Sequence, residues 1–531
     1  MTSNLFNGDV IDSIGTEARA PILIAYMGFM GVSLLWLLSR AAGEAEDPES
    51  FYVADRSLSS VFNGFALAGE NISVLTLLGV SGNIAFFGYD GYTYAVDSML
   101  ALGVLLFLAQ RIHANGRYTL GDLFASRSPG VSSHLAGSLT TLSVTVPLLM
   151  IQLHVAGAST AYLLGLTSTG PQIVCTIAMG AFVTCVACLG GLKGTSLMHI
   201  LKLAFVVVAL AVISVLSLSH YSWDFGTLLS TAMEKSTAPE NYLEPGFGQH
   251  SVDFGPLNTL SNHVVLVLGS ALMPQLILRV TATRDGHAAR RSVAVAATLT
   301  GCFTVLLVTV SFAAAAVAGG EKVGAADFGP SALITLAAGI TSGNSSFSVG
   351  IVTALACAVF LAVLTTIASM TFATAVSVVR DVYARGEEDG VRAGEVRLVR
   401  LASAAVAIVG IALTVATHHL PLRFLASFSL CVAASCVFPA LVYSFFWRGF
   451  NRRGLLWSVY GGLGLCVLLT VFSPTVSGAP VALLPDMDFD WYPLQSPGLV
   501  SISGAFLLGW LGSVTAPRRA ASHSRRPGIR V

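Results

Sequence analysis

The sequence predicts an all-α membrane protein with about 13 transmembrane helices. Hydrophobic residues make up 54% of its 531 residues, charged residues only 11%, and the mean hydropathy is +0.76. A soluble globular chain carries about 25% charged residues, so the deficit excludes a disordered protein, a coiled coil and an ordinary soluble enzyme. The 28 basic and 28 acidic residues balance, which excludes a strongly basic nucleic-acid binder.

A spanning helix needs about 20 mostly apolar residues. The longest polar connections, 220–257 and 379–399, leave no room for a large soluble domain between the spans. The segments that meet the requirement are 20–39, 59–87, 91–110, 135–163, 171–191, 196–219, 258–279, 292–319, 349–378, 400–417, 421–446, 454–473 and 497–514.

Basic residues set the expected orientation, because lysine and arginine are enriched in cytoplasmic connections. With the N-terminus outside, the cytoplasmic connections and the tail hold 23 basic residues and the outer ones hold 4. We therefore expect a multi-pass protein of the cytoplasmic membrane with a basic cytoplasmic tail at 515–531. Lys202 falls within the sixth span, and its side chain is expected to extend towards the cytoplasmic surface.

The second span carries polar residues at mid-membrane depth, where they are costly and therefore indicate a functional site. Gly69, Glu70, Asn71 and Ser73 lie within one turn or two of each other. Glycine permits an unwound backbone, and an interrupted helix exposes carbonyls and helix ends that bind a cation and an anionic group. The alternative is a polar helix–helix contact. Glu70 is a weaker candidate than the backbone around it, since its side chain can lie on the opposite helix face.

Asp97 in the third span has three open interpretations: it relays a proton, contacts a solute or faces an aqueous vestibule. His154 in the fourth span and His199 in the sixth are expected to be structural polar groups. The sequence contains no HExxH, GxSxG or Walker motif, so a zinc protease or an ATP-driven pump is unsupported. We do not expect an enzyme.

The ninth span carries a stripe of small and hydroxylated residues: Ala362, Thr365, Thr366 and Ser369 share one helix face. Hydroxyl and carbonyl oxygens are suitable ligands for a hard cation such as sodium. The alternative is that these residues only let two helices approach closely.

Over roughly residues 20–470 the sequence resembles the sodium:solute symporter family, and within it the acetate/monocarboxylate permease branch. The resemblance lies in short motifs that occur in the expected order along the spans. They are Phe51-Tyr52-Val53-Ala54-Asp55-Arg56, Asn63-Gly64, Ala68-Gly69-Glu70, Leu78-Gly79-Val80-Ser81-Gly82, Gly88-Tyr89-Asp90-Gly91, Gly116-Arg117-Tyr118-Thr119, Gly121-Asp122, Gly190-Gly191-Leu192-Lys193-Gly194-Thr195, Pro274 with Arg279, and Asp381-Val382-Tyr383.

This resemblance implies a core of five helices repeated in inverted orientation, at about 59–219 and 258–446, with spans 1, 12 and 13 peripheral. Spans 2 and 7 would be broken at the midplane, and transport would proceed by alternating access. The implied sodium ligands are the carbonyls of Gly69, Ile72 and Ala362 and the hydroxyls of Thr365 and Thr366. The implied solute contacts are Asn71, Ser73, Thr76, Tyr94 and Ser270.

We therefore expect a secondary symporter that couples inward sodium movement to uptake of a short monocarboxylate such as acetate, propionate or pyruvate. Beyond the bilayer, sodium and the solute, the sequence indicates no cofactor and no obligatory protein partner. No lysine or arginine is expected at mid-membrane depth, so the carboxylate would depend on helix dipoles, hydroxyls and the bound cation.

Three alternatives stay open. The Thr365–Thr366 pair resembles the sugar and proline branches more than the acetate branch, which favours sodium coupling but leaves an amino-acid or sugar symporter possible. Glu70 and Asp97 keep proton coupling open. A non-transporting sensor would need a separate signalling partner, since only 17 residues follow position 514.

Overall fold

The computed structural model describes residues 48–164, 166, 168–189, 191–247, 254–320, 331–340, 345–383, 394–479 and 482–516, and six residues between 24 and 32. Within this part of the chain every regular element is a helix, with two isolated backbone bridges. The first predicted span, 20–39, and the tail beyond 516 lie outside the described residues apart from those six. The count of thirteen spans therefore stays a prediction.

Ten helices in the described residues are long and apolar enough to cross a membrane. With a bent pair and one shorter apolar helix, they correspond to predicted spans 2 to 13. In chain order these are α4 (Ser60–Asn71) with η2 (Leu75–Val80) and α5 (Ser81–Phe87); α6 (Tyr89–Asn115); α8 (Val131–Leu163); α9 (Thr169–Leu189); α10 (Leu192–His220); α12 (Gly255–Ala271) with α13 (Pro274–Thr281); α14 (Gly286–Ala318); α17 (Ser345–Ser377) with η4 (Val378–Tyr383); α18 (Glu395–Ala416); α19 (Leu422–Val432) with η5 (Ala433–Val437) and α20 (Phe438–Phe446); α21 (Arg452–Val471); and α22 (Gly498–Val514).

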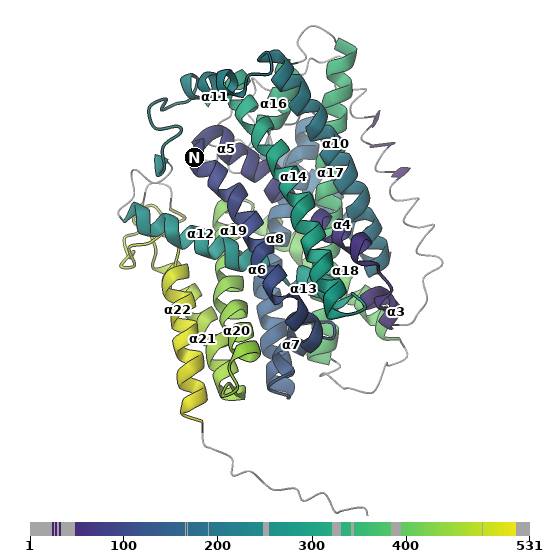
Figure 1. Ribbon diagram of the computed structural model, residues 1–531, viewed down its shortest axis with the longest axis vertical. Coiled ribbons are helices and arrows are strands. Elements are labelled where there is room, and N and C mark those ends of the chain that lie inside the picture. The colour runs from purple at the N-terminus through teal and green to yellow at the C-terminus, as the bar shows by residue number, and fades with distance from the viewer. Residues whose placement is uncertain are drawn as a thin grey trace, which may run out of the picture.

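Short helices occupy the connections. Figure 1 shows α11 (Phe225–Glu234) and α16 (Ser331–Ile340) at one end of the molecule and α7 (Leu120–Ala125) at the opposite end. α3 (Pro48–Val53) and η1 (Ala54–Arg56) precede α4. A capping box fixes the start of α7, because the Thr119 hydroxyl and the Asp122 carboxylate each accept a backbone N–H of the other residue.

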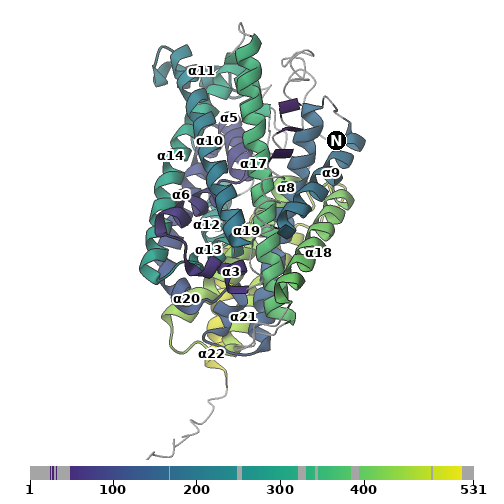
Figure 2. The ribbon, with the colours of Figure 1, turned by 90° about the vertical axis from the view of Figure 1, so that its right-hand side faces the viewer.

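The described helices pack as an inverted repeat. Helices at equivalent places in the two halves contact one another: α6 packs on α14, α8 on α17 and α9 on α18. Figure 2 shows α9 and α18 on one side of the molecule and α6 and α14 on the other. The all-helical, five-plus-five architecture expected from the sequence is confirmed, whereas the residue limits of the repeats stay predictions.

Both predicted breaks are present. In the second span α4 and the following helix are bent by 57°. In the seventh span α12 ends at Ala271, and Met273 adopts extended angles (φ −63°, ψ 138°) before Pro274 starts α13. Proline has no N–H to donate, so it is tolerated in a first helical turn and not in a helix interior. The local sequence thus determines where the seventh span is interrupted.

Candidate functional site

The break in the second span leaves backbone carbonyls free. α4 ends at Asn71, and Ile72 has φ −83° and ψ 84°, which is not helical. The Ile72 N–H still donates to the Ala68 carbonyl at 3.1 Å. In a continuous helix the N–H groups of Ser73 and Thr76 would donate to the carbonyls of Gly69 and Ile72. Here the Ser73 N–H donates to the Asn71 carbonyl at 3.1 Å and the Thr76 N–H donates to the Ser73 hydroxyl at 3.3 Å. The C-terminal end of a helix carries partial negative charge, so the Gly69 and Ile72 oxygens can ligate a cation.

Gly69 is required for close packing rather than for the unwinding itself. A Cβ atom at this position would lie 2.3 Å from the carbonyl oxygen of His199 on α10, which no side chain tolerates. The backbone departs from helical angles three residues later, at Ile72. Glycine therefore allows the end of α4 to pack against α10. This packing sets the position of the Gly69 and Ile72 carbonyls at the end of the helix.

Two adjacent threonines on α17 differ in their hydrogen bonding. The Thr365 hydroxyl donates to the Leu361 carbonyl at 2.7 Å, the usual bond of a helical threonine. The Thr366 hydroxyl is buried and has no hydrogen-bond partner among the described residues. An unpaired buried polar group costs about 1–3 kcal/mol, so the Thr366 oxygen is suited to receive a ligand. Ala362, one turn before, is fully buried.

Ser369 ties this face of α17 to the break in the second span. Its hydroxyl donates to the Glu70 carboxylate, 299 positions away in the sequence. Ser369 follows Thr366 by one turn, and Glu70 follows Gly69 directly. The contact thus brings together the two segments from which the five implied sodium ligands come.

Glu70 is the centre of a buried polar cluster. Its Oε2 accepts a hydrogen bond from Arg279 Nε on α13 at 2.7 Å and lies 3.0 Å from His199 Nε2 on α10. Arg279 Nη1 donates to the Ser196 hydroxyl at 2.8 Å. Glu70 and Arg279 side chains are each 1% exposed, and such burial is tolerated only when the charges are paired. Glu70 therefore holds four helices together: α4, α10, α13 and α17.

Two basic side chains, Lys202 and Arg279, are buried in the interior, contrary to expectation. Lys202 does not extend to a surface: it is fully buried on α10 and interacts electrostatically with Glu70 and Arg279. Arg279, at the C-terminal end of the predicted seventh span, is also buried, and its guanidinium points into the interior. Because Arg279 pairs with Glu70, which the sequence places at mid-membrane depth, the prediction that no lysine or arginine lies at that depth is wrong. The physical reason is the Glu70 carboxylate, whose charge compensates for burying cations.

The implied solute contacts Asn71, Ser73 and Thr76 meet at the break. The Thr76 hydroxyl donates to the Asn71 carbonyl at 3.1 Å, and the Thr76 N–H donates to the Ser73 hydroxyl at 3.3 Å. These bonds replace those that the unwound backbone has lost. The Asn71 amide nitrogen is buried without a partner among the described residues, so it can donate to a ligand.

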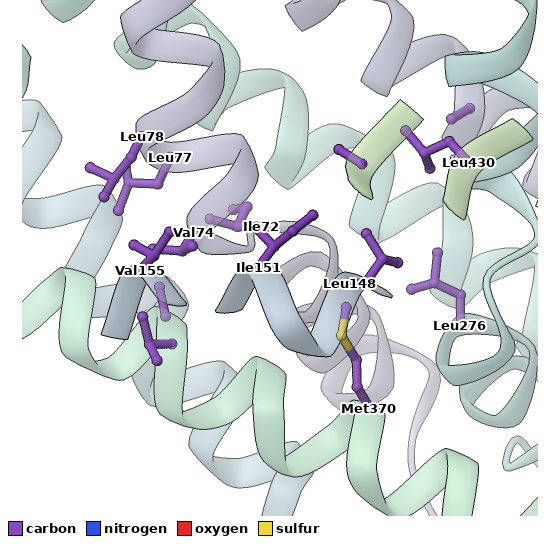
Figure 3. Close-up of a cluster of buried hydrophobic side chains, with 14 of the residues drawn as sticks. Ile72, Val74, Leu77, Leu78, Leu148, Ile151, Val155, Leu276, Met370 and Leu430 are labelled. Atoms are coloured by element: carbon purple, nitrogen blue, oxygen red, sulfur yellow. The ribbon is translucent and has the colours of Figure 1, made fainter. Parts of the chain in front are cut away.

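Apolar side chains surround the break. Figure 3 shows Ile72 and Val74 beside Ile151 and Val155 of α8, and Met370 of α17 below Leu148 of α8. All of these side chains are buried. A polar group of a small solute at this place would be separated from water, which strengthens each hydrogen bond or ionic contact that it makes.

The other candidates lie on α6 and α12. Asp97 contacts His263 Nδ1, and the rings of Tyr94 and His263 have centroids 6.1 Å apart. Ser270 is partly buried in the last turn of α12. In the described residues, no hydrogen bond joins these side chains to the polar residues at the break. Nothing in the sequence distinguishes His263, because a functional role for a lone histidine in an apolar span depends on the acid that it contacts, here Asp97.

A second polar cluster links α7, α8 and the end of α17. The Asp381 carboxylate accepts hydrogen bonds from Thr119 and Ser377, each at 2.8 Å, and lies 2.9 Å from His134 Nδ1. With Asp122, one ligand atom from each acid and the histidine falls within 4.8 Å, a spacing that suits a metal ion. Since hydrogen bonds already occupy Asp381 and His134, we interpret this cluster as a structural connection.

Near that cluster, α3 is tied to α18. The Tyr52 hydroxyl donates to Glu395 Oε1 at 2.9 Å, and Arg380 Nη1 lies 3.4 Å from the same oxygen. Burial and the neighbouring Glu395 charge both raise the pKa of Tyr52, so its hydroxyl stays a donor. This hydrogen bond holds α3, the helix that precedes α4, against the start of α18.

Comparisons with known proteins assign the chain to a family of transporters. A family model described as "Sodium:solute symporter family" matches residues 51–462. The chain is 31% identical to a "Monocarboxylic acid transporter" of Corynebacterium glutamicum, over 95% of this chain and 93% of that protein. It is also 31% identical to an "Uncharacterized symporter YwcA" of Bacillus subtilis, over 96% and 97% of the two chains.

Solved structures match the fold. A sodium-coupled sialic acid symporter in a substrate-bound, outward-open state aligns with a TM-score of 0.71 at 11% identity, covering 94% of this chain and 98% of that one. A nucleobase–cation symport-1 family transporter in a closed conformation aligns with a TM-score of 0.56 at 15% identity, covering 90% and 98%. At these identities the likeness concerns the fold alone.

Proposed function

The chain belongs to the sodium:solute symporter family, and from this premise we propose that it couples inward sodium movement to uptake of a short-chain monocarboxylate. The family and the fold make it a multi-pass membrane transporter rather than an enzyme. Uptake would proceed by alternating access around the broken helices. Sodium and the solute would be its small partners.

The sodium site that we propose lies between α4 and α17. Its ligands would be the carbonyls of Gly69, Ile72 and Ala362 and the hydroxyls of Thr365 and Thr366. The observation that carries the proposal is the coincidence of free carbonyls at the end of α4 with the unpaired Thr366 hydroxyl. Uncharged oxygen atoms of this kind suit a hard monovalent cation.

The monocarboxylate assignment rests on the relative from Corynebacterium glutamicum, which is named for that substrate class. The Asn71 amide supports it, because an unpaired buried donor can bond a carboxylate oxygen. Asn71, Ser73, Thr76, Tyr94 and Ser270 remain the proposed solute contacts.

We further propose that the protein sits in the cytoplasmic membrane with its N-terminus outside and its C-terminus inside. The 23-to-4 split of basic residues supports this orientation. It would place the α7 end of the bundle in the cytoplasm and α11 outside, at opposite ends of the molecule as Figure 1 shows. Labelling of single cysteines introduced into α7 and α11 with an impermeant reagent on intact cells tests it: only the α11 site should react.

Labelled acetate uptake into proteoliposomes tests the function. An inward sodium gradient is compared with a pH gradient of equal size, with unlabelled pyruvate, proline and glucose as competitors. We expect sodium-driven uptake that pyruvate alone reduces. One sodium with one carboxylate is electroneutral, so an imposed membrane potential should change nothing, whereas each further charge would add about 2.3 kcal/mol per 100 mV.

The other outcomes have definite meanings. Uptake driven only by the pH gradient would remove the sodium site between α4 and α17 and favour a proton-coupled carrier. Competition by proline or glucose alone would favour the amino-acid or sugar alternative. Absence of acetate uptake under either gradient would overturn the monocarboxylate assignment.

A further inference from the structure

A carboxylate buried in the transporter needs a cationic or strongly polar partner to offset the loss of water. Two buried basic side chains, Arg279 and Lys202, lie near the break among the described residues. Arg279 pairs with Glu70. Lys202 lies in the same cluster and is fully buried, 0% exposed. Lys202 Nζ and Arg279 Nη2 have no hydrogen-bond partner among the described residues, but both side chains are enclosed by protein.

His263 differs from these residues in its exposure. Its side chain is 27% exposed, whereas that of its partner Asp97 is 7% exposed. Asp97 contacts the ring through Nδ1, which leaves the second nitrogen, Nε2, on the far side of the ring. No hydrogen bond to Nε2 occurs within the described part of the chain. The pair connects α6 with α12, 166 positions apart.

We propose that His263, held in place by Asp97, binds the carboxylate group of the solute through Nε2–H. The inference rests on the proposed function and extends it, because it names a side chain that recognises the substrate class. The protonated ring donates one N–H to Asp97 and the other to the carboxylate. Tyr94, whose ring lies 6.1 Å from that of His263, shapes the adjoining space.

The charge balance favours this arrangement. Asp97 and an imidazolium are neutral as a pair, so the pair does not repel an arriving anion as a lone acid would. Neutral histidine would donate its single N–H to Asp97 and present a lone pair to the solute carboxylate, which repels it. Affinity for the carboxylate should therefore weaken as pH rises and His263 loses its proton.

Other charged groups around α12 are few. From α6, Asp90 and Asp97 both interact electrostatically with His263, and Tyr94 stands beside its ring. From α19, Arg423 lies over the Phe87 ring and interacts with Tyr94. The residues of η5 and α22 include no acid, lysine or arginine. Asp97 is thus the group in direct contact that positions the ring.

The test is the pH dependence of the KM for labelled acetate in proteoliposomes at saturating sodium, from about pH 5.5 to 8.5. The wild-type KM should rise with pH. His263→Gln should raise the KM about tenfold at the acidic end and flatten the profile, because the charge-assisted bond is gone. His263→Arg should restore a low KM without pH dependence, which a merely structural role would not produce.

Two comparisons complete the design. Asp97→Asn should raise the KM while leaving the maximal rate less affected, since it disturbs the orientation of His263. His154→Gln is the matched control: that histidine lies on α8 and lines a small pocket with residues of α9 and α18, so the KM and its pH profile should stay unchanged.

The outcomes separate the inference from the function it rests on. A wild-type KM independent of pH, or a His263→Gln variant with the wild-type KM and profile, overturns the role of His263 while sodium-driven uptake stands. Absence of carboxylate uptake by the wild type overturns the proposed function and the inference with it. If His263→Gln fails to fold, the wild-type profile and His263→Arg decide.

Discussion

Glu70 and Arg279 form a buried ion pair between the two broken spans: Arg279 Nε lies 2.7 Å from Glu70 Oε2, 209 positions away in the sequence. Glu70 lies in the last turn of α4, the first half of the second span, and Arg279 belongs to α13, the second half of the seventh span. The same carboxylate reaches His199 on α10 and Ser369 on α17. One side chain thus fixes the geometry of both breaks.

Glu70→Gln should destabilise the folded protein strongly. Removing one partner of a buried ion pair leaves the other charge uncompensated and costs about 3–5 kcal/mol. Arg279 would then lack its carboxylate, and Lys202 would stand beside it. The free energy of unfolding, measured by SDS titration of purified protein, checks the expectation; Glu234→Gln, at an exposed position on α11, is the control.

Combining Glu70→Gln with Arg279→Met should restore part of that loss, because the orphaned charge is removed with its partner. The double variant is therefore expected to be less destabilised than the sum of the two single variants. Strict additivity would mean that the two side chains act independently.

Thr366→Ala should weaken sodium binding selectively. Of the two hydroxyls among the proposed sodium ligands, the variant removes the one that has no hydrogen-bond partner in the described residues. Loss of one oxygen ligand should raise the sodium concentration for half-maximal uptake about tenfold. The acetate KM at saturating sodium should stay close to the wild-type value.

Thr371→Ala is a matched control for that measurement. Thr371 is another buried threonine of α17 whose hydroxyl has no partner among the described residues, but it lies on a different helix face. Equal sodium dependence in the Thr366→Ala and Thr371→Ala variants would argue against the cation site.

Gly69→Ala should push α4 away from α10. The added methyl would lie 2.3 Å from the His199 carbonyl, and overpacking of this kind costs about 1–3 kcal/mol. Both the melting temperature and the apparent sodium affinity should fall, since the free carbonyls move with α4. Gly103→Ala places its methyl where no atom lies within 4 Å and should change neither quantity.

Tyr52→Phe should loosen the tie between α3 and α18 by about 1 kcal/mol, the net worth of a typical hydrogen bond. Because the pKa of Tyr52 is raised in the folded state, the stabilisation is fully present below the unfolded pKa of about 10 and is lost only above it. The difference in unfolding free energy between wild type and variant should therefore stay constant from about pH 6 to 9. A difference that changes across this range would contradict the assigned bond.

Most of the fold follows from local properties of the sequence. The hydrocarbon thickness requires long apolar segments, and the described helices coincide with predicted spans 2 to 13 within a few residues. The interruption of the seventh span follows from Pro274, and the break in the second span follows a run of polar residues. Desolvation and backbone hydrogen bonding depend on the residues of one segment. The sequence of that segment is therefore enough to predict where a span lies and where it is interrupted.

The partners of the polar side chains were decided by the tertiary structure alone. The sequence predicts that the Lys202 side chain extends from the sixth span towards the cytoplasmic surface, and nothing in it distinguishes His263. Their surroundings depend on Glu70 and Asp97, which belong to other helices. Electrostatic pairing acts through space between residues far apart in the chain, so hydropathy and spacing along one helix could not predict which buried charges meet.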